Sequence, residues 1–187
     1  MKKMTIAVLI GAIIMFLYQA LSWMALPVHD NAFKFAPSQD SVLQDMSGME
    51  EGVYSLPMKS ADATKAEEHE FQETRVGKPW AVLFYHPSME MNMGKTMAIW
   101  FLINFVPVWM FVWILVIGNV AGMRRVVMLS LVVAVIIIFN QHLMNMNWFS
   151  YPMHFLTGEM ADTLISWLLV GCWVGWFLNR GNQQASA

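Results

Sequence analysis

The stretch HPSMEMNMGKT sets His86 three residues ahead of three alternate methionines, Met89, Met91 and Met93. Thioethers are soft metal ligands that keep their lone pairs at any pH, and together with imidazole they favour monovalent copper. In an extended chain these methionines would point to one face, because side chains alternate with a period of two. The spacing therefore makes this stretch a candidate copper site.

A second run of the same kind, HLMNM, contributes His142, Met144 and Met146. Two such clusters at one membrane face would make a shared site for copper binding or delivery. Methionine also has a plainer use, since it is flexible and fills irregular packing. If the chain is helical from His86 onward, Met89, Met93 and Met97 form a stripe at i, i+4 and i+8 for packing or for contact with a partner.

Other chemistry finds little support in the sequence. GKT, at residues 94–96, matches the end of a phosphate-binding loop, but the glycine required five residues earlier is Met89. The single cysteine, Cys172, lies in an apolar block, and no Ser/His/Asp set or H-E-x-x-H motif occurs. A formal net charge of −2 does not fit nucleic-acid binding, which needs an excess of basic residues. We therefore predict a non-enzymatic protein that binds no nucleic acid, with copper as the only candidate cofactor.

Composition places these residues in a membrane protein. Of 187 residues, 57% are hydrophobic and only 13% are charged, which is more apolar than a soluble domain of this size. The apolar residues fall into four blocks of about 20, the length that crosses a bilayer. We predict transmembrane helices over residues 1–26, 96–118, 126–144 and 160–179.

The charge distribution predicts an orientation. Basic residues flank the apolar blocks at the start of the chain, between the second and third blocks, and after the fourth: Lys2, Lys3, Arg124, Arg125 and Arg180. Residues 27–95 contain 6 basic and 11 acidic residues, a net charge of −5. The positive-inside rule then places both termini in the cytoplasm, with a tail at 180–187. It places residues 27–95 and a turn at 145–159 outside a bacterial inner membrane.

The long acidic segment contains patterns of a small cap. PSQDSVLQDMSG is typical of a short helix with Ser38 as its N-cap, and GVYSLP and PWAVLFYHP are typical of strands. The polar stretch between those strands is either a helix or a loop. The predicted fold class is thus an all-α integral membrane protein with a small α+β extracytoplasmic cap. Because such a cap is marginal alone, it should rest on the membrane helices or on a partner.

Several polar residues lie within the predicted spans, towards their outer ends: Gln19, Ser22, Asn104, Asn140, Gln141, His142, Asp162, Thr163 and Ser166. Polar groups without partners are disfavoured in hydrocarbon, so we expect these to face one another or a water-filled pocket. A pocket would have Asp162 and Glu159 at its rim. The alternative is that they serve only as interhelical hydrogen bonds.

Pairs of small residues four apart predict close helix contacts. They occur in the first block, at Ala7 and Gly11, and in the fourth, at Gly171 and Gly175. Such faces serve either packing inside the bundle or association with a membrane partner or a second copy.

Three motifs, SWMALPVHD, GVYSLP and HPSMEMNMG, occur in this order along the chain. In that order they resemble an uncharacterised family of bacterial inner-membrane proteins. The resemblance implies the membrane topology and transfers no catalytic or binding residue. We expect an accessory, scaffold or assembly subunit that packs against a larger membrane complex, with copper binding as the alternative.

Overall fold

The computed structural model describes residues 2–180, so the rest of the predicted tail lies outside the described residues. The chain divides into two compact units. The first, which we call the bundle unit, comprises Met1–Phe35 and Asn92–Ala187. The second, which we call the insert, comprises Ala36–Met91.

Helices form almost all of the bundle unit. They are α1 (Lys2–Met24), α4 (Met93–Ile117), α5 (Met123–Ile137), η1 (Ile138–Leu143), α6 (Met144–Phe149) and α7 (Met153–Asn179). Because α5, η1 and α6 follow one another without a break, the unit has four helical spans long and apolar enough to cross a membrane. These spans confirm the predicted number of apolar helices and fit a multi-pass membrane protein.

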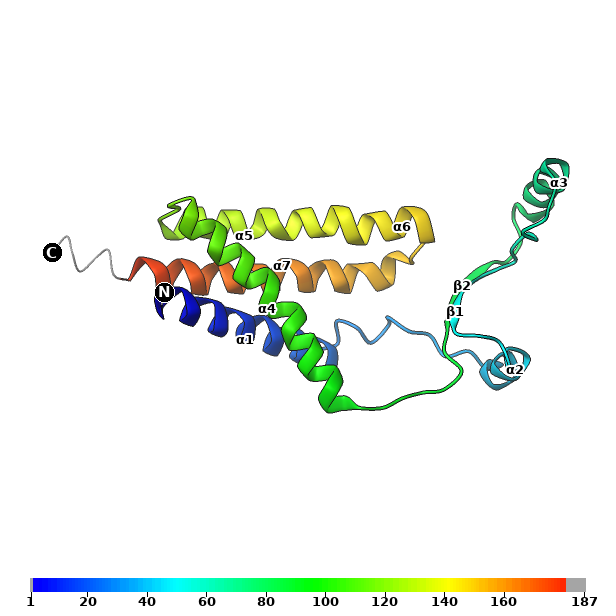
Figure 1. The fold of residues 1–187 in the computed structure, drawn as a ribbon, viewed down its shortest axis with the longest axis horizontal. Helices are drawn as coiled ribbons and strands as arrows, with labels where there is room; N and C mark the ends of the chain where they lie inside the picture. Colours follow the sequence, from blue (N-terminus) through cyan, green and yellow to red (C-terminus); the bar gives the residue numbers. More distant parts are fainter. Residues whose placement is uncertain (1, 181–187) are drawn as a thin grey trace. The chain divides into compact units, whose positions relative to one another are not determined.

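The four spans pack side by side. Within the bundle unit α7 lies between α5 and α1, and α4 runs obliquely against α1 (Figure 1). The core between them consists mainly of small and branched side chains: Ala7, Val8, Ala12, Met15, Val108, Phe111, Val112, Leu115, Val126, Ala134, Trp167, Val170 and Val174. Such side chains let the helices approach closely, as is common where helices pack in a membrane.

The four small residues of the predicted association faces are used in this packing. A Cβ on Gly11 would lie 3.1 Å from Val108 Cγ1, and one on Gly175 would lie 2.7 Å from Met123 Sδ. Gly171 faces α5, and Ala7 is fully buried. These faces are therefore occupied within the chain, and a partner would have to contact other residues.

The third and fourth spans are longer than the predicted blocks. The predicted turn at 145–159 is reduced to three residues, because α6 continues to Phe149 and α7 begins at Met153. Ser150 adopts a left-handed conformation, φ 49°, and ends α6, while Pro152 is the N-cap of α7. The apolar blocks are shorter than the helices, because a helix continues through polar residues until the backbone changes conformation.

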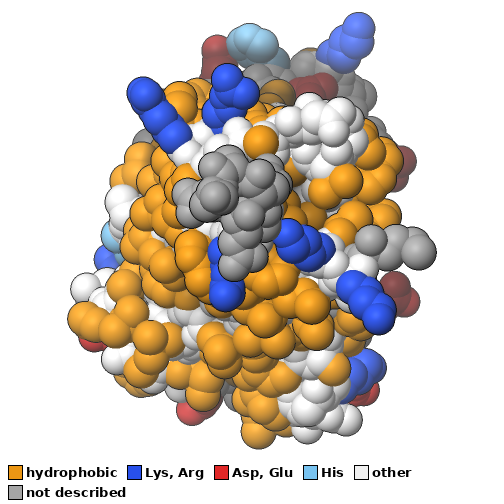
Figure 2. Space-filling model, turned by 90° about the vertical axis from the view of Figure 1, so that its left-hand side faces the viewer, with side chains coloured by type: hydrophobic (Ala, Val, Ile, Leu, Met, Phe, Trp, Pro, Cys, Tyr) orange, Lys and Arg blue, Asp and Glu red, His pale blue; other side chains and the backbone are white. Residues whose placement is uncertain are grey.

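The bundle surface is largely apolar. At the end that carries the start of α1 and the end of α7, Lys and Arg side chains project from a surface of hydrophobic ones (Figure 2). Five of the chain's basic residues belong to this end, at the start of α1, the start of α5 and the end of α7.

The insert contains both predicted strands as an antiparallel hairpin, β1 (Gly52–Leu56) and β2 (Ala81–Tyr85). It also contains the predicted short helix, α2 (Gln39–Asp45). Ser38 is the N-cap residue of α2 but makes no side-chain capping bond. The polar stretch between the strands forms α3 (Lys65–Arg75), which begins with a capping box between Thr64 and Glu67.

Candidate functional site

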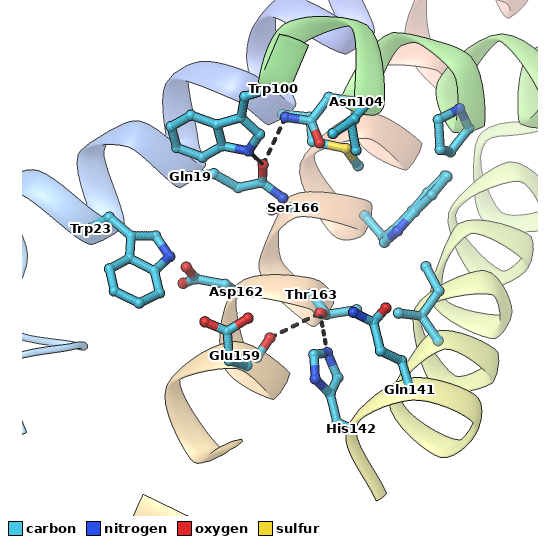
Figure 3. Close-up of a pocket in the computed structure, with 15 residues that line it drawn as sticks. Gln19, Trp23, Trp100, Asn104, Gln141, His142, Glu159, Asp162, Thr163 and Ser166 are labelled. Carbon is cyan, nitrogen blue, oxygen red and sulfur yellow. Dashed lines mark hydrogen bonds between the residues drawn. The ribbon is translucent and has the colours of Figure 1, made fainter. Parts of the chain in front are cut away.

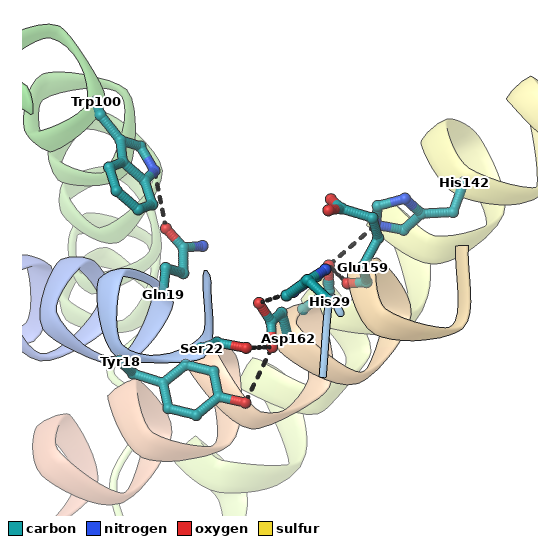
Figure 4. Close-up of polar contacts among 9 residues, drawn as sticks. Tyr18, Gln19, Ser22, His29, Trp100, His142, Glu159 and Asp162 are labelled. Carbon is teal, nitrogen blue, oxygen red and sulfur yellow. Dashed lines mark hydrogen bonds and ion pairs between the residues drawn. The ribbon is translucent and has the colours of Figure 1, made fainter. Parts of the chain in front are cut away.

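The candidate site is built around the carboxylate of Asp162, which is buried in the first half of α7. Its Oδ1 accepts hydrogen bonds from two side chains of α1, Tyr18 at 3.1 Å and Ser22 at 2.6 Å. Its Oδ2 lies 3.0 Å from Nε2 of His29 (Figure 4). Tyr18 and Ser22 are four apart, so they share one face of α1. A carboxylate among membrane helices thus has partners on both oxygens.

His29 is held in place by its neighbours on two sides. The ring of Trp23 stacks on it, with centroids 3.9 Å apart and planes 7° apart. Gly158 of α7 leaves room for it, because a Cβ there would lie 2.9 Å from His29 Cε1. The imidazole can therefore reach Asp162 only because residue 158 lacks a side chain.

A second set of polar contacts joins α1 to α4. Oε1 of Gln19 accepts hydrogen bonds from Nδ2 of Asn104 at 2.7 Å and from Nε1 of Trp100 at 3.2 Å. Trp100 and Asn104 are four apart and share one face of α4. These bonds confirm that Gln19 and Asn104 face each other across two helices.

A third set joins the third span to α7. Nε2 of His142 lies 3.0 Å from Oγ1 of Thr163, and that hydroxyl donates to the backbone carbonyl of Glu159 at 2.8 Å. Because the hydroxyl has one hydrogen and donates it to Glu159, the contact with His142 requires Nε2 to carry a hydrogen. His142 lies in the π-helix η1, a local feature that often occurs at functional sites.

These three sets surround a pocket of about 310 Å³ in the bundle unit (Figure 3). Its lining comes from α1, α4, the third span and α7. The polar lining residues are Gln19, Trp23, Trp100, Asn104, Gln141, His142, Glu159, Asp162, Thr163 and Ser166, and the apolar ones are Met15, Ile103, Pro107, Ile137 and Trp167. The pocket is just large enough for a small polar molecule or a headgroup.

The sequence leaves open whether its polar residues line a pocket or bond one another, and the structure has both, since Gln19, Asn104, His142 and Thr163 form interhelical hydrogen bonds and also line the pocket with Glu159 and Asp162. The sequence did not predict that His29 contacts Asp162 or that Trp23 lines the pocket. The signal was present in the first motif, SWMALPVHD, since Ser22, Trp23 and His29 all lie around Asp162. Asn140 does not join the pocket, because its Nδ2 donates to the carbonyl of Ile136 in its own helix.

The candidate copper ligands lie in both units. His86, Met89 and Met91 belong to the insert, whereas Met93, His142, Met144 and Met146 belong to the bundle unit. Met89, Met91 and Met93 are 87%, 80% and 64% exposed, so Met89 and Met93 of the predicted stripe are not packed against the described residues. The helix begins only at Met93, which leaves residues 86–92 outside it.

Two of these ligands lie together. His86 and Met89 line one hollow of the insert, where Nδ1 of His86 lies 3.2 Å from Oε1 of Glu51. Within residues 2–180, no three His, Cys, Asp or Glu side chains form a group that could hold a metal ion. Copper binding there would depend on the thioethers.

No protein-family model, curated protein or solved structure matches this chain. The resemblance of the three motifs to a bacterial membrane family therefore stays a prediction, and the site is interpreted from its own geometry.

Proposed function

We propose that this chain is a non-enzymatic accessory, scaffold or assembly subunit of a larger complex in a bacterial inner membrane. The observation that carries the proposal is the nearly complete lack of an interior in the insert. Only Met46 and Tyr85 are buried among residues 36–91. A segment that buries so little cannot offset the entropy lost on ordering it. We therefore expect the insert to gain its burial from a partner.

The hairpin offers a surface for this contact. Val53 and Phe84 lie opposite each other in the register and are each 63% exposed. A two-stranded hairpin is marginally stable alone, and a cross-strand apolar pair stabilises it most when covered. The insert also has four basic and ten acidic residues, a net charge of −6. The expected partner surface is therefore apolar at its centre and basic around it.

The basic end of the bundle unit supports an orientation with both termini in the cytoplasm. Lys2 and Lys3 begin α1, Arg124 and Arg125 begin α5, and Arg180 follows α7. By the positive-inside rule this end stays in the cytoplasm, which puts the insert on the opposite side of the membrane. The partner surface would then be extracytoplasmic.

The test is native gel migration of the protein extracted from its own membrane in mild detergent. We expect a complex larger than the chain itself, with a partner at fixed stoichiometry identified by mass spectrometry. Changing Val53→Glu together with Phe84→Glu should release the chain as a smaller species. Val76→Glu is the matched control, because Val76 is 83% exposed but lies outside the hairpin. Migration of the wild type as an isolated chain, or equal effects of both changes, would contradict the proposal.

Copper binding is the second candidate, favoured by the exposure of the three thioethers. A competition titration with monovalent copper should show sub-micromolar binding that is lost when Met89, Met91 and Met93 become Leu. This change keeps the apolar volume and removes the sulfur. Equal affinity in the wild type and the variant would remove the methionines from consideration.

A further inference from the structure

The pocket of the bundle unit contains a buried polar group that the protein leaves without a partner. Ser166 is 1% exposed, lines the pocket, and its Oγ has no hydrogen-bond partner among the described residues. Buried hydroxyls are nearly always hydrogen-bonded, because leaving one unpaired is unfavourable. Something that enters the pocket would complete this bond.

The charges that line the pocket indicate that a positively charged group would bind there. Asp162 has His29, Tyr18 and Ser22 as partners. Glu159 lies three residues earlier on the same face of α7, and its carboxylate has no hydrogen bond or ion pair among residues 2–180. The lining described above includes no Lys or Arg. A carboxylate within a membrane bundle calls for a positive partner.

The backbone of α4 adds an acceptor at the same place. Pro107 lies inside α4 and has no amide hydrogen, so the carbonyl of Ile103 lacks its usual i+4 donor. Both residues line the pocket. Ile103 can therefore accept a hydrogen bond that the helix does not supply.

The remaining walls favour an organic cation over a metal ion. Trp23, Trp100 and Trp167 line the pocket, and indole faces attract ammonium groups. A metal ion would need several ionised or imidazole ligands at once, whereas the pocket offers one free carboxylate. An ammonium group carries a positive charge and N–H donors, which suit the carboxylate of Glu159.

We propose that this pocket binds a small primary amine, with Glu159 as the counter-ion of its ammonium group and Ser166, two turns further along α7, as a hydrogen-bonding partner for another polar atom of the same molecule. The pocket lies in the half of the spans that contains the end of α1 and the starts of α4 and α7, and it extends from Trp23 to the middle of α4 at Pro107. This depth suits both a soluble amine and the ethanolamine headgroup of a lipid. The proposal does not depend on the partner contact of the insert.

The test uses ethanolamine as the probe and ethylene glycol as a control of the same size without the charge. Binding is measured by calorimetry on the full chain, in amine-free buffer and detergent. We expect saturable binding of ethanolamine only. Glu159→Gln should weaken it roughly ten- to a hundredfold, and Ser166→Ala roughly two- to tenfold. Glu73→Gln, an exposed carboxylate of α3, should leave the affinity unchanged.

A second arm distinguishes the two sources of the ammonium group. The chain is placed in nanodiscs of phosphatidylglycerol with or without phosphatidylethanolamine. Thermal stabilisation by phosphatidylethanolamine in the wild type, absent in Glu159→Gln, assigns the site to a lipid headgroup. Binding of free ethanolamine without this stabilisation assigns it to a soluble amine. Equal behaviour of ethanolamine and ethylene glycol, with no effect of the lipid, would overturn the proposal without requiring any variant to fold.

Discussion

Asp162 connects three parts of the bundle unit through one carboxylate. Tyr18 and Ser22 of α1 and His29 of the following segment all meet it on α7. A buried ion pair stabilises only if its remaining lone pairs are also satisfied. Here both carboxylate oxygens accept bonds, so we expect this cluster to fix how α1 and the segment after it lie on α7.

A double-mutant cycle tests this expectation. Asp162→Ala should destabilise the chain by about 3 kcal/mol, because it leaves His29, Tyr18 and Ser22 without the carboxylate that they share. His29→Ala should cost less, because Tyr18 and Ser22 still bond Asp162. Their coupling energy should reach about 1–3 kcal/mol. The measurement is reversible unfolding by SDS in mixed micelles.

The neutral pair of the same bundle gives the control. Gln19→Ala and Asn104→Ala should couple by only about 0.6 kcal/mol, the average for hydrogen bonds between membrane helices. A coupling of His29 with Asp162 no greater than this would mean that the ion pair does not organise the bundle.

At the residue scale the sequence predicts that polar groups meet, but not which ones. Gln19 and Asn104, Ser22 and Asp162, and His142 and Thr163 do pair between helices. The contact of His29 with Asp162 could not be predicted, because His29 follows the first apolar block and hydropathy does not show in which direction the chain turns there. Ser166 Oγ has no hydrogen-bond partner among residues 2–180, which only the packed side chains reveal.

Among the elements, α5 and α7 make the closest approach. A Cβ on Gly171 would lie 2.0 Å from Ser130 Oγ and 3.2 Å from the backbone of Val127. Gly171→Ala should therefore push the helices apart and lower the free energy of unfolding by about 1–3 kcal/mol. Unfolding in mixed micelles measures this loss.

Two further variants test the cause. Ser130→Gly in the Gly171→Ala background should restore part of the stability, because it removes the nearest atoms. Gly94→Ala is the matched control, since its nearest neighbour is Asn92 Oδ1 at 3.8 Å. A Gly171→Ala variant as stable as Gly94→Ala would contradict this close contact.

The capping box of α3 predicts that the stability of this helix depends on pH. The backbone amide and the hydroxyl of Thr64 donate to the carboxylate of Glu67, and these bonds lower the pKa of Glu67 from its usual 4.5. A lowered folded-state pKa means that the stabilisation is full above the unfolded value and is lost as the pH falls through the folded one.

Hydrogen exchange of α3, corrected for intrinsic rates, measures this effect. Glu67→Ala should speed exchange at pH 7, and the difference should shrink as the pH falls below 4.5 and through the lowered folded-state pKa. Glu70→Ala controls for the higher helix propensity of alanine. A difference in exchange that stays the same as the pH falls would show that the charge is not the cause.

At the scale of elements, hydropathy and alternation predict the four spans, both strands and α2. They do not predict the π-helix at 138–143 or the extension of helix to Phe149 and from Met153. Both features depend on backbone geometry rather than on apolar content. The helix α3 was left open, although Thr64 and Glu67 have the spacing of a capping box.

For the whole molecule, the account joins a four-span bundle that carries a polar pocket to an acidic insert with almost no interior. The apolar helices explain the composition, and the insert explains the acidic charge of residues 27–95. The central claim is that the insert faces away from the cytoplasm, where it meets its partner. The side of the membrane on which the partner surface lies rests on this orientation.

Cysteine labelling tests this claim most directly. In a Cys172→Ser background, Ser60→Cys marks the insert and Ala121→Cys marks the turn between α4 and α5, and both positions are exposed. A membrane-impermeant maleimide applied to intact spheroplasts should label Ser60→Cys, and should reach Ala121→Cys only after permeabilisation. The opposite pattern, or labelling of both positions from the same side, would contradict the orientation on which the account depends.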